Sequence, residues 1–198
     1  MTTTLQPTVE NILTVYRSAS AGQVKDGMNW YSEAHSLALV LDPTNPLRAA
    51  GIIAAFSPRV PWRRNVALAV QTYADGVAAP KCLGRSVAKA QAILDGKDVV
   101  DTLKGPKTVA FALTIADPTD PMAVVVDRHA MSVAIGRSAT DEDQKGLKRT
   151  YELFAACYRE AARRAGIAPS QMQAITWVVW RETSIRTAAA ARREAGRG

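Results

Sequence analysis

The spacing of apolar residues constrains the fold of this chain more than any other feature, because it repeats at three and four positions and almost nowhere at two. Val124–Val126 favours a strand by composition, but no partner strand is in view, so we expect an extended segment there. The sequence therefore predicts an all-α fold of nine or ten helices in two lobes. The predicted helices cover residues 9–18, 28–41, 47–56, 62–75, 87–94 (with Ser86 as N-cap), 99–103, 107–116, 128–136, 141–166 and 171–186.

No repeat or low-complexity linker divides the 198 residues, which predicts one helical domain over 1–187. Residues 188–198 consist of Ala, Arg and Gly apart from one glutamate, and are predicted to form a basic, disordered tail. The longest apolar stretches, 49–56 and 122–126, are far shorter than the roughly 20 residues of a membrane span. The N-terminus has no basic segment followed by an apolar one, so we expect no signal peptide and a cytoplasmic location.

The cysteines and histidines are too few for the common metal sites. Cys82 and Cys157 can form neither a disulfide scaffold nor a thiolate cluster within one chain. His35 and His129 stand alone, without a His-Glu-x-x-His pattern. We therefore predict no metal and no other cofactor.

The charge balance makes nucleic acid a plausible partner. Lys and Arg number 25 against 18 Asp and Glu, giving a net charge of +7. Seventeen of the basic residues are Arg, whose forked guanidinium can bind phosphate in two places. A GC-rich genome also favours Arg and Ala codons, so the charge alone does not decide between the two explanations.

The stretch 103–108, Leu-Lys-Gly-Pro-Lys-Thr, predicts a hairpin between two helices at about 99–116, and an apolar run then leads to Asp127. Lys107 and Asp127 are twenty positions apart. This pattern resembles the helix-hairpin-helix (HhH-GPD) base-excision DNA glycosylases, which include endonuclease III and the adenine glycosylase. The resemblance extends over Leu47–Glu182, with 51–58, Trp62 and Asn65 similar to the family's early core helix and the loop that follows it.

The resemblance implies a monomeric enzyme that cleaves the N-glycosidic bond of a damaged or modified base extruded from double-stranded DNA. Asp127 would stabilise the sugar cation of the transition state. Lys107, if partly desolvated against Val109, Ala110 and Leu113, would form a Schiff base and add AP-lyase activity. Both side chains would then face one cleft. The residues expected to contact DNA are Arg59, Arg63, Arg64, Lys104, Gly105, Thr108, Arg128 and His129.

Two departures from the family pattern are visible. The hairpin is two residues shorter than the usual Leu-Pro-Gly-Val-Gly, and Pro106 replaces the second glycine, which removes one backbone donor for a DNA phosphate. The four-cysteine cluster of endonuclease III is missing, since no cysteine follows Ala165. The chain would be a member without an iron–sulfur cluster.

Other interpretations remain open for the same residues. Asp127 could serve only as a helix N-cap, and Lys107 could be a surface lysine that touches phosphate or water. The whole chain could be a phage or mobile-element relative that modifies bases or nucleotides. It could also be a helical DNA-binding module without catalysis.

Overall fold

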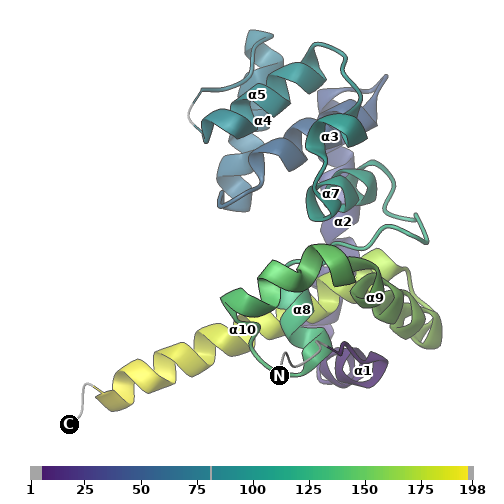
Figure 1. Ribbon diagram of the computed structural model, residues 1–198, viewed down its shortest axis with the longest axis vertical. Helices are drawn as coiled ribbons and strands as arrows, with labels where there is room; N and C mark the ends of the chain where they lie inside the picture. Colours follow the sequence, from purple (N-terminus) through teal and green to yellow (C-terminus); the bar gives the residue numbers. More distant parts are fainter. Residues whose placement is uncertain (1–5, 81, 196–198) are drawn as a thin grey trace. The chain divides into compact units, whose positions relative to one another are not determined.

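The computed structural model describes residues 6–80 and 82–195, with side chains as far as residue 187, and in this part of the chain it contains ten helices and no strand (Figure 1). The predicted all-α fold is confirmed. No helix of these residues combines the length and the apolar character that a membrane crossing needs. Residues 123–127 form neither helix nor strand, and Asp127, the last of them, has an extended backbone.

The chain divides into two compact units. We call residues 31–125 the inserted unit, and residues 1–30 together with 126–198 the terminal unit. The chain passes from one to the other within α2 (Ala21–Leu41) and again between Val125 and Val126. The sequence carries no linker at either point, and the expectation that 1–187 acts as one domain stays a prediction.

The inserted unit is built around α3, whose residues 49–56 are all buried. This helix packs against the four that follow it, because it is apolar on every side. Gly51 permits the close approach of α6, since a Cβ added there would lie 2.7 Å from Cγ1 of Val99. The helices of this unit after α2 are α3 (Pro46–Phe56), α4 (Trp62–Asp75), α5 (Gly84–Leu94), α6 (Val99–Leu103) and α7 (Pro106–Ala116).

The terminal unit joins the first helix of the chain to the last three. α1 packs against α8, α9 and α10, and its side chain Asn11 donates to the backbone oxygen of Ala134 at 3.0 Å. α2 passes very close to α10 at Gly27, where a Cβ would lie 2.5 Å from Cα of Ile175. The further helices of this unit are α1 (Val9–Arg17), α8 (Arg128–Ile135), α9 (Asp141–Ala165) and α10 (Pro169–Ala195).

Two predicted helix starts are wrong by three residues or more. α2 begins at Ala21 rather than Met28, because the Ser20 hydroxyl accepts from the Gln23 N–H while the Gln23 side chain accepts from the Ser20 N–H. This reciprocal pair is a capping box. It stabilises the helix start and so offsets the low helix propensity of the glycine in the first turn. Ser86, predicted as an N-cap, instead lies buried within α5, which begins at Gly84 after Leu83.

The end of the last helix also differs from the prediction. α10 continues to Ala195, whereas the sequence pattern ended it near Arg186 and left 188–198 as a disordered tail. Ala and Arg are among the strongest helix formers, and no Gly or Pro interrupts the chain before Gly196. Residues 196–198 lie outside the described part of the chain.

Candidate functional site

The predicted hairpin is present in the inserted unit. α6 and α7 are joined by only Lys104 and Gly105, with Lys104 in the left-handed conformation at φ 59°. The turn is closed internally, since the Gly105 N–H donates to the oxygen of Leu103 at 2.7 Å and the Thr108 hydroxyl donates to the oxygen of Gly105 at 3.0 Å. Four of the predicted site residues, Lys104, Gly105, Lys107 and Thr108, therefore lie together at this turn.

The hairpin offers few backbone donors to a ligand. The N–H groups of Lys104 and Gly105 are used within the turn, and Pro106 has none. The N–H groups of Lys107 and Thr108 lie in the first turn of α7, where backbone donors have no intrahelical acceptor. Such a helix start attracts an anion, and the chain carries two lysines, Lys104 and Lys107, within two positions of Pro106, the first residue of α7.

Lys107 itself is exposed. The expected burial against the apolar side of α7 is absent: Lys107 is exposed in the first turn of the helix, although Ala110, about one turn further on, is buried. A lysine becomes a nucleophile when burial or a neighbouring cation lowers its pKa, so that the neutral amine is populated. The exposure of Lys107 does not provide such burial.

Asp127 is the N-cap of α8 in the terminal unit. Its Oδ1 accepts from the N–H of Ala130 at 2.8 Å, and its side chain is half-buried. Among the described residues, no hydrogen bond to the second oxygen, Oδ2, is made. The capping interpretation is thus correct for one oxygen, while the other remains open to a ligand.

Two tyrosines on α9 surround Asp127 and were not predicted. The Tyr151 hydroxyl accepts from the N–H of Val126 at 3.0 Å, and the buried Tyr158 hydroxyl donates to the oxygen of Ala130 at 3.0 Å. Burial, together with the smaller effect of the Asp127 charge, raises the pKa of both phenols. Their spacing of seven positions, two turns of one helix face, is the sequence signal that could have indicated them.

The two residues after Asp127 are engaged within the terminal unit. Arg128 donates from Nε to the oxygen of Ala139 at 3.0 Å and forms an ion pair with Asp141 at 3.1 Å. The His129 ring meets Trp177 edge to face at 6.2 Å. The guanidinium of Arg181 covers the Trp177 ring at 4.9 Å. These contacts order the start of α8 around the carboxylate.

The three predicted arginines of the inserted unit lie around the start of α4. Arg59, at φ 62°, belongs to the loop after α3, and Arg63 and Arg64 occupy the first turn of α4. All three are exposed, and Pro61 gives the helix no side-chain cap. Beneath them Asn65 is 1% exposed, and its Oδ1 accepts no hydrogen bond among the described residues.

The predicted site residues thus form three groups, at the hairpin, at the start of α8 and at the start of α4. Lys107 belongs to the inserted unit and Asp127 to the terminal unit, so the expectation that they face one cleft stays a prediction. No group of three or more His, Cys, Asp or Glu side chains suited to a metal ion occurs in the described residues.

Comparison with known proteins identifies a protein family: its model matches residues 1–184. No curated protein and no solved structure matches the chain.

Proposed function

The chain belongs to that family, described as a family of unknown function (DUF7178), and from its own residues we propose that it is a DNA glycosylase of the helix-hairpin-helix type. The proposed reaction removes a damaged or modified base from double-stranded DNA. The observation that carries this proposal is the Asp127 carboxylate, which is fixed through Oδ1 by the Ala130 N–H while Oδ2 accepts no hydrogen bond from the described residues.

The chemistry needs a carboxylate of this kind. When an N-glycosidic bond breaks, the base leaves with the bonding electron pair and the sugar becomes a cation. A carboxylate already held in place stabilises that cation without reorganising during the reaction. Water then bonds to the anomeric carbon and loses a proton, and the departing base gains one, so the products are the sugar hydroxyl and the neutral base. The α8 start holds the carboxylate, and the tyrosines of α9 fix the backbone on both sides of it.

The hairpin supports the choice of DNA as substrate. The backbone donors of Lys107 and Thr108 and the ammonium groups of Lys104 and Lys107 suit the phosphates of a DNA strand. Because Lys107 is exposed, we propose that water, rather than Lys107, attacks the sugar. The enzyme would then release the base without cutting the strand.

A non-catalytic DNA-binding module is the second candidate. The exposure of Lys107 and the capping bond of Asp127 favour it, because both residues would then have ordinary surface and structural roles. Such a module would bind duplex DNA and leave every base in place.

The test incubates the full chain with duplexes that each contain one altered base, and resolves the products before and after alkali. We expect one duplex to be cut only after alkali. Asp127→Asn should retain the fold, since Asn caps a helix as well as Asp does. It should lose at least 100-fold in excision rate, about 2.7 kcal/mol of barrier.

Matched controls separate the candidates. Asp75→Asn removes the same charge from an exposed position on α4 and should leave excision unchanged. Borohydride should trap no protein–DNA adduct; a trapped adduct that Lys107→Ala abolishes would restore the Schiff-base mechanism. Binding of all duplexes without excision would favour the DNA-binding module. Turnover of a free nucleotide alone would favour a nucleotide-modifying enzyme.

A further inference from the structure

A groove of about 530 Å³ lies between α5 and α6 in the inserted unit. This groove is a different feature from the start of α7 with its backbone donors, because side chains of α5 and α6 line it. We call it the α5–α6 groove. Its charged and polar lining consists of Lys89, Lys97, Asp98, Asp101, Thr102 and Lys104.

Lys89 places a fixed positive charge in this groove. Its Nζ donates to the oxygen of Leu103 at 2.7 Å, and the side chain is half-buried. A carbonyl oxygen neutralises no charge, and no carboxylate of the described residues forms an ion pair with Lys89. Two N–H bonds of the ammonium remain for a ligand.

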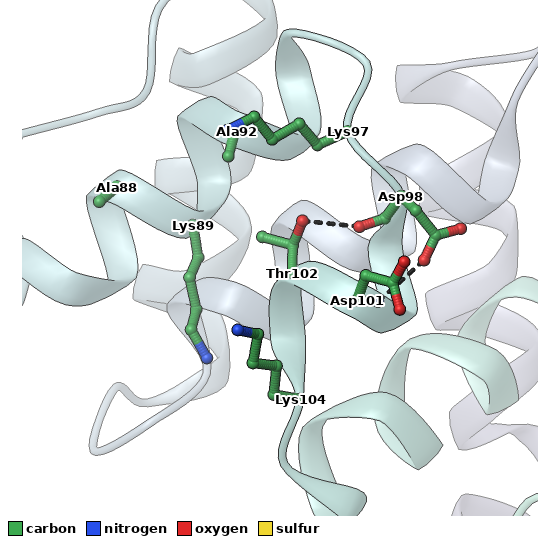
Figure 2. A pocket seen from close by; sticks show the side chains of 8 residues that line it. All are labelled: Ala88, Lys89, Ala92, Lys97, Asp98, Asp101, Thr102 and Lys104. Carbon is green, nitrogen blue, oxygen red and sulfur yellow. Dashed lines mark hydrogen bonds between the residues drawn. The ribbon is translucent and has the colours of Figure 1, made fainter.

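Lys104 brings a second ammonium to the same place. In Figure 2 the side chains of Lys89 and Lys104 extend toward one another, while the carboxylates of Asp98 and Asp101 lie on the other side of the groove. The backbone of Lys104 is left-handed, a conformation that costs a residue with a side chain about 1 kcal/mol or more. The strained turn holds this lysine at the groove.

The acidic side chains of the groove do not neutralise its lysines. Asp98 accepts from the N–H of Asp101 at 2.8 Å and thereby caps α6. Within the described residues, Lys97 and Lys104 form no ion pair with either aspartate. Two ammonium groups that point toward each other repel unless an anion lies between them. A phosphate group fits this demand, because its oxygens accept from several ammonium groups at once.

We propose that the α5–α6 groove binds a phosphate group between Lys89 and Lys104. The phosphate belongs either to the backbone of DNA or to a free phosphate compound. Only the DNA form of this inference rests on the proposed function.

The first experiment uses inorganic phosphate as the probe. The full chain is titrated with phosphate at constant ionic strength, and backbone amide shifts are followed by NMR. We expect saturable shifts at the groove residues of the wild type. Lys89→Gln and Lys104→Gln should each weaken this binding about tenfold. Lys148→Gln, which removes the charge of an exposed lysine on α9, should not.

Equal phosphate binding by the wild type and both groove variants, or shifts that never saturate, would overturn the proposal. Lys104→Gln provides the decisive comparison if Lys89→Gln fails to fold, because the Lys104 side chain makes no hydrogen bond in the described residues.

The second experiment identifies the source of the phosphate, using an unmodified DNA duplex. If the backbone occupies the groove, Lys89→Gln should raise the Kd about tenfold and reduce the log–log salt slope by about one. If DNA affinity stays the same while phosphate binding is lost, the groove binds a free phosphate compound. Neither measurement requires excision, so failure of the proposed glycosylase activity would be recognised separately.

Discussion

Asp42 is a buried carboxylate whose charge is compensated within the inserted unit. It is 4% exposed and accepts from Arg48 Nε and from the hydroxyls of Tyr73 and Thr44, the last two at 3.1 Å. Burial raises the pKa of Asp42, but these hydrogen bonds outweigh burial, so the pKa lies below its usual value. The same cluster, with burial as the main cause, raises the pKa of Tyr73. The ionised carboxylate therefore stabilises the fold.

We expect Asp42→Asn to reduce the free energy of unfolding by about 2 kcal/mol at pH 7, because Arg48 loses its partner in a largely buried place. The pKa of Asp42 is lower in the folded than in the unfolded protein. The contribution of its charge to stability is therefore complete at a pH above the unfolded-state pKa, and is lost as the pH falls through the folded-state pKa. Denaturant unfolding between pH 7 and pH 2 should show the two proteins converging in acid. A difference that stays constant over this range would contradict the assignment.

At the scale of elements, the crossing of α2 and α10 depends on Gly27. A side chain there would meet the backbone of Ile175 at 2.5 Å, and backbone cannot move aside as a flexible side chain can. Gly27→Ala should therefore destabilise the terminal unit by about 3 kcal/mol, measured by thermal or denaturant unfolding. Gly22→Ala, in the same helix but with no atom nearer than 4.0 Å, should be neutral or stabilise by up to about 1 kcal/mol. Equal effects of the two changes would rule out a close crossing.

Helices with a continuous apolar stripe were predictable from the sequence. The bounds of α4 and α6 match the prediction, and α1, α3, α7, α8 and α9 differ from it by one residue at an end. In α5, the local signal of an N-cap residue was outweighed. Ser86 has the chemistry of an N-cap, yet its side chain is buried because α5 starts two residues earlier.

The candidate site was predictable only in part. The turn at Lys104 and the N-cap role of Asp127 follow from local sequence, since a short turn and a helix start are set by neighbouring residues. The exposure of Lys107 and the bond from Lys89 to Leu103 depend on how α5 and α7 pack. Residues distant in sequence decide such packing, and the spacing of apolar residues within one helix does not indicate it.

For the molecule as a whole, the net charge of +7 should make DNA binding largely electrostatic. If about five phosphates are contacted, the affinity should fall with salt with a log–log slope of roughly −4 to −5. Fluorescence anisotropy with an unmodified duplex at several salt concentrations measures this slope. Binding that does not change with salt, or no binding at low salt, would point instead to a nucleotide substrate or a protein partner.

The insertion of one unit within the other sets the order in which the chain can fold during its synthesis. α1 leaves the ribosome first, but its packing partners α8, α9 and α10 begin more than a hundred residues later. At about 5–20 residues per second, the first helix waits roughly 5–20 s before it has anything to cover its apolar side. All of residues 31–125 emerge during that interval. The inserted unit can therefore fold on the nascent chain while the buried Ile12 and Leu13 of the finished protein are still exposed to chaperones.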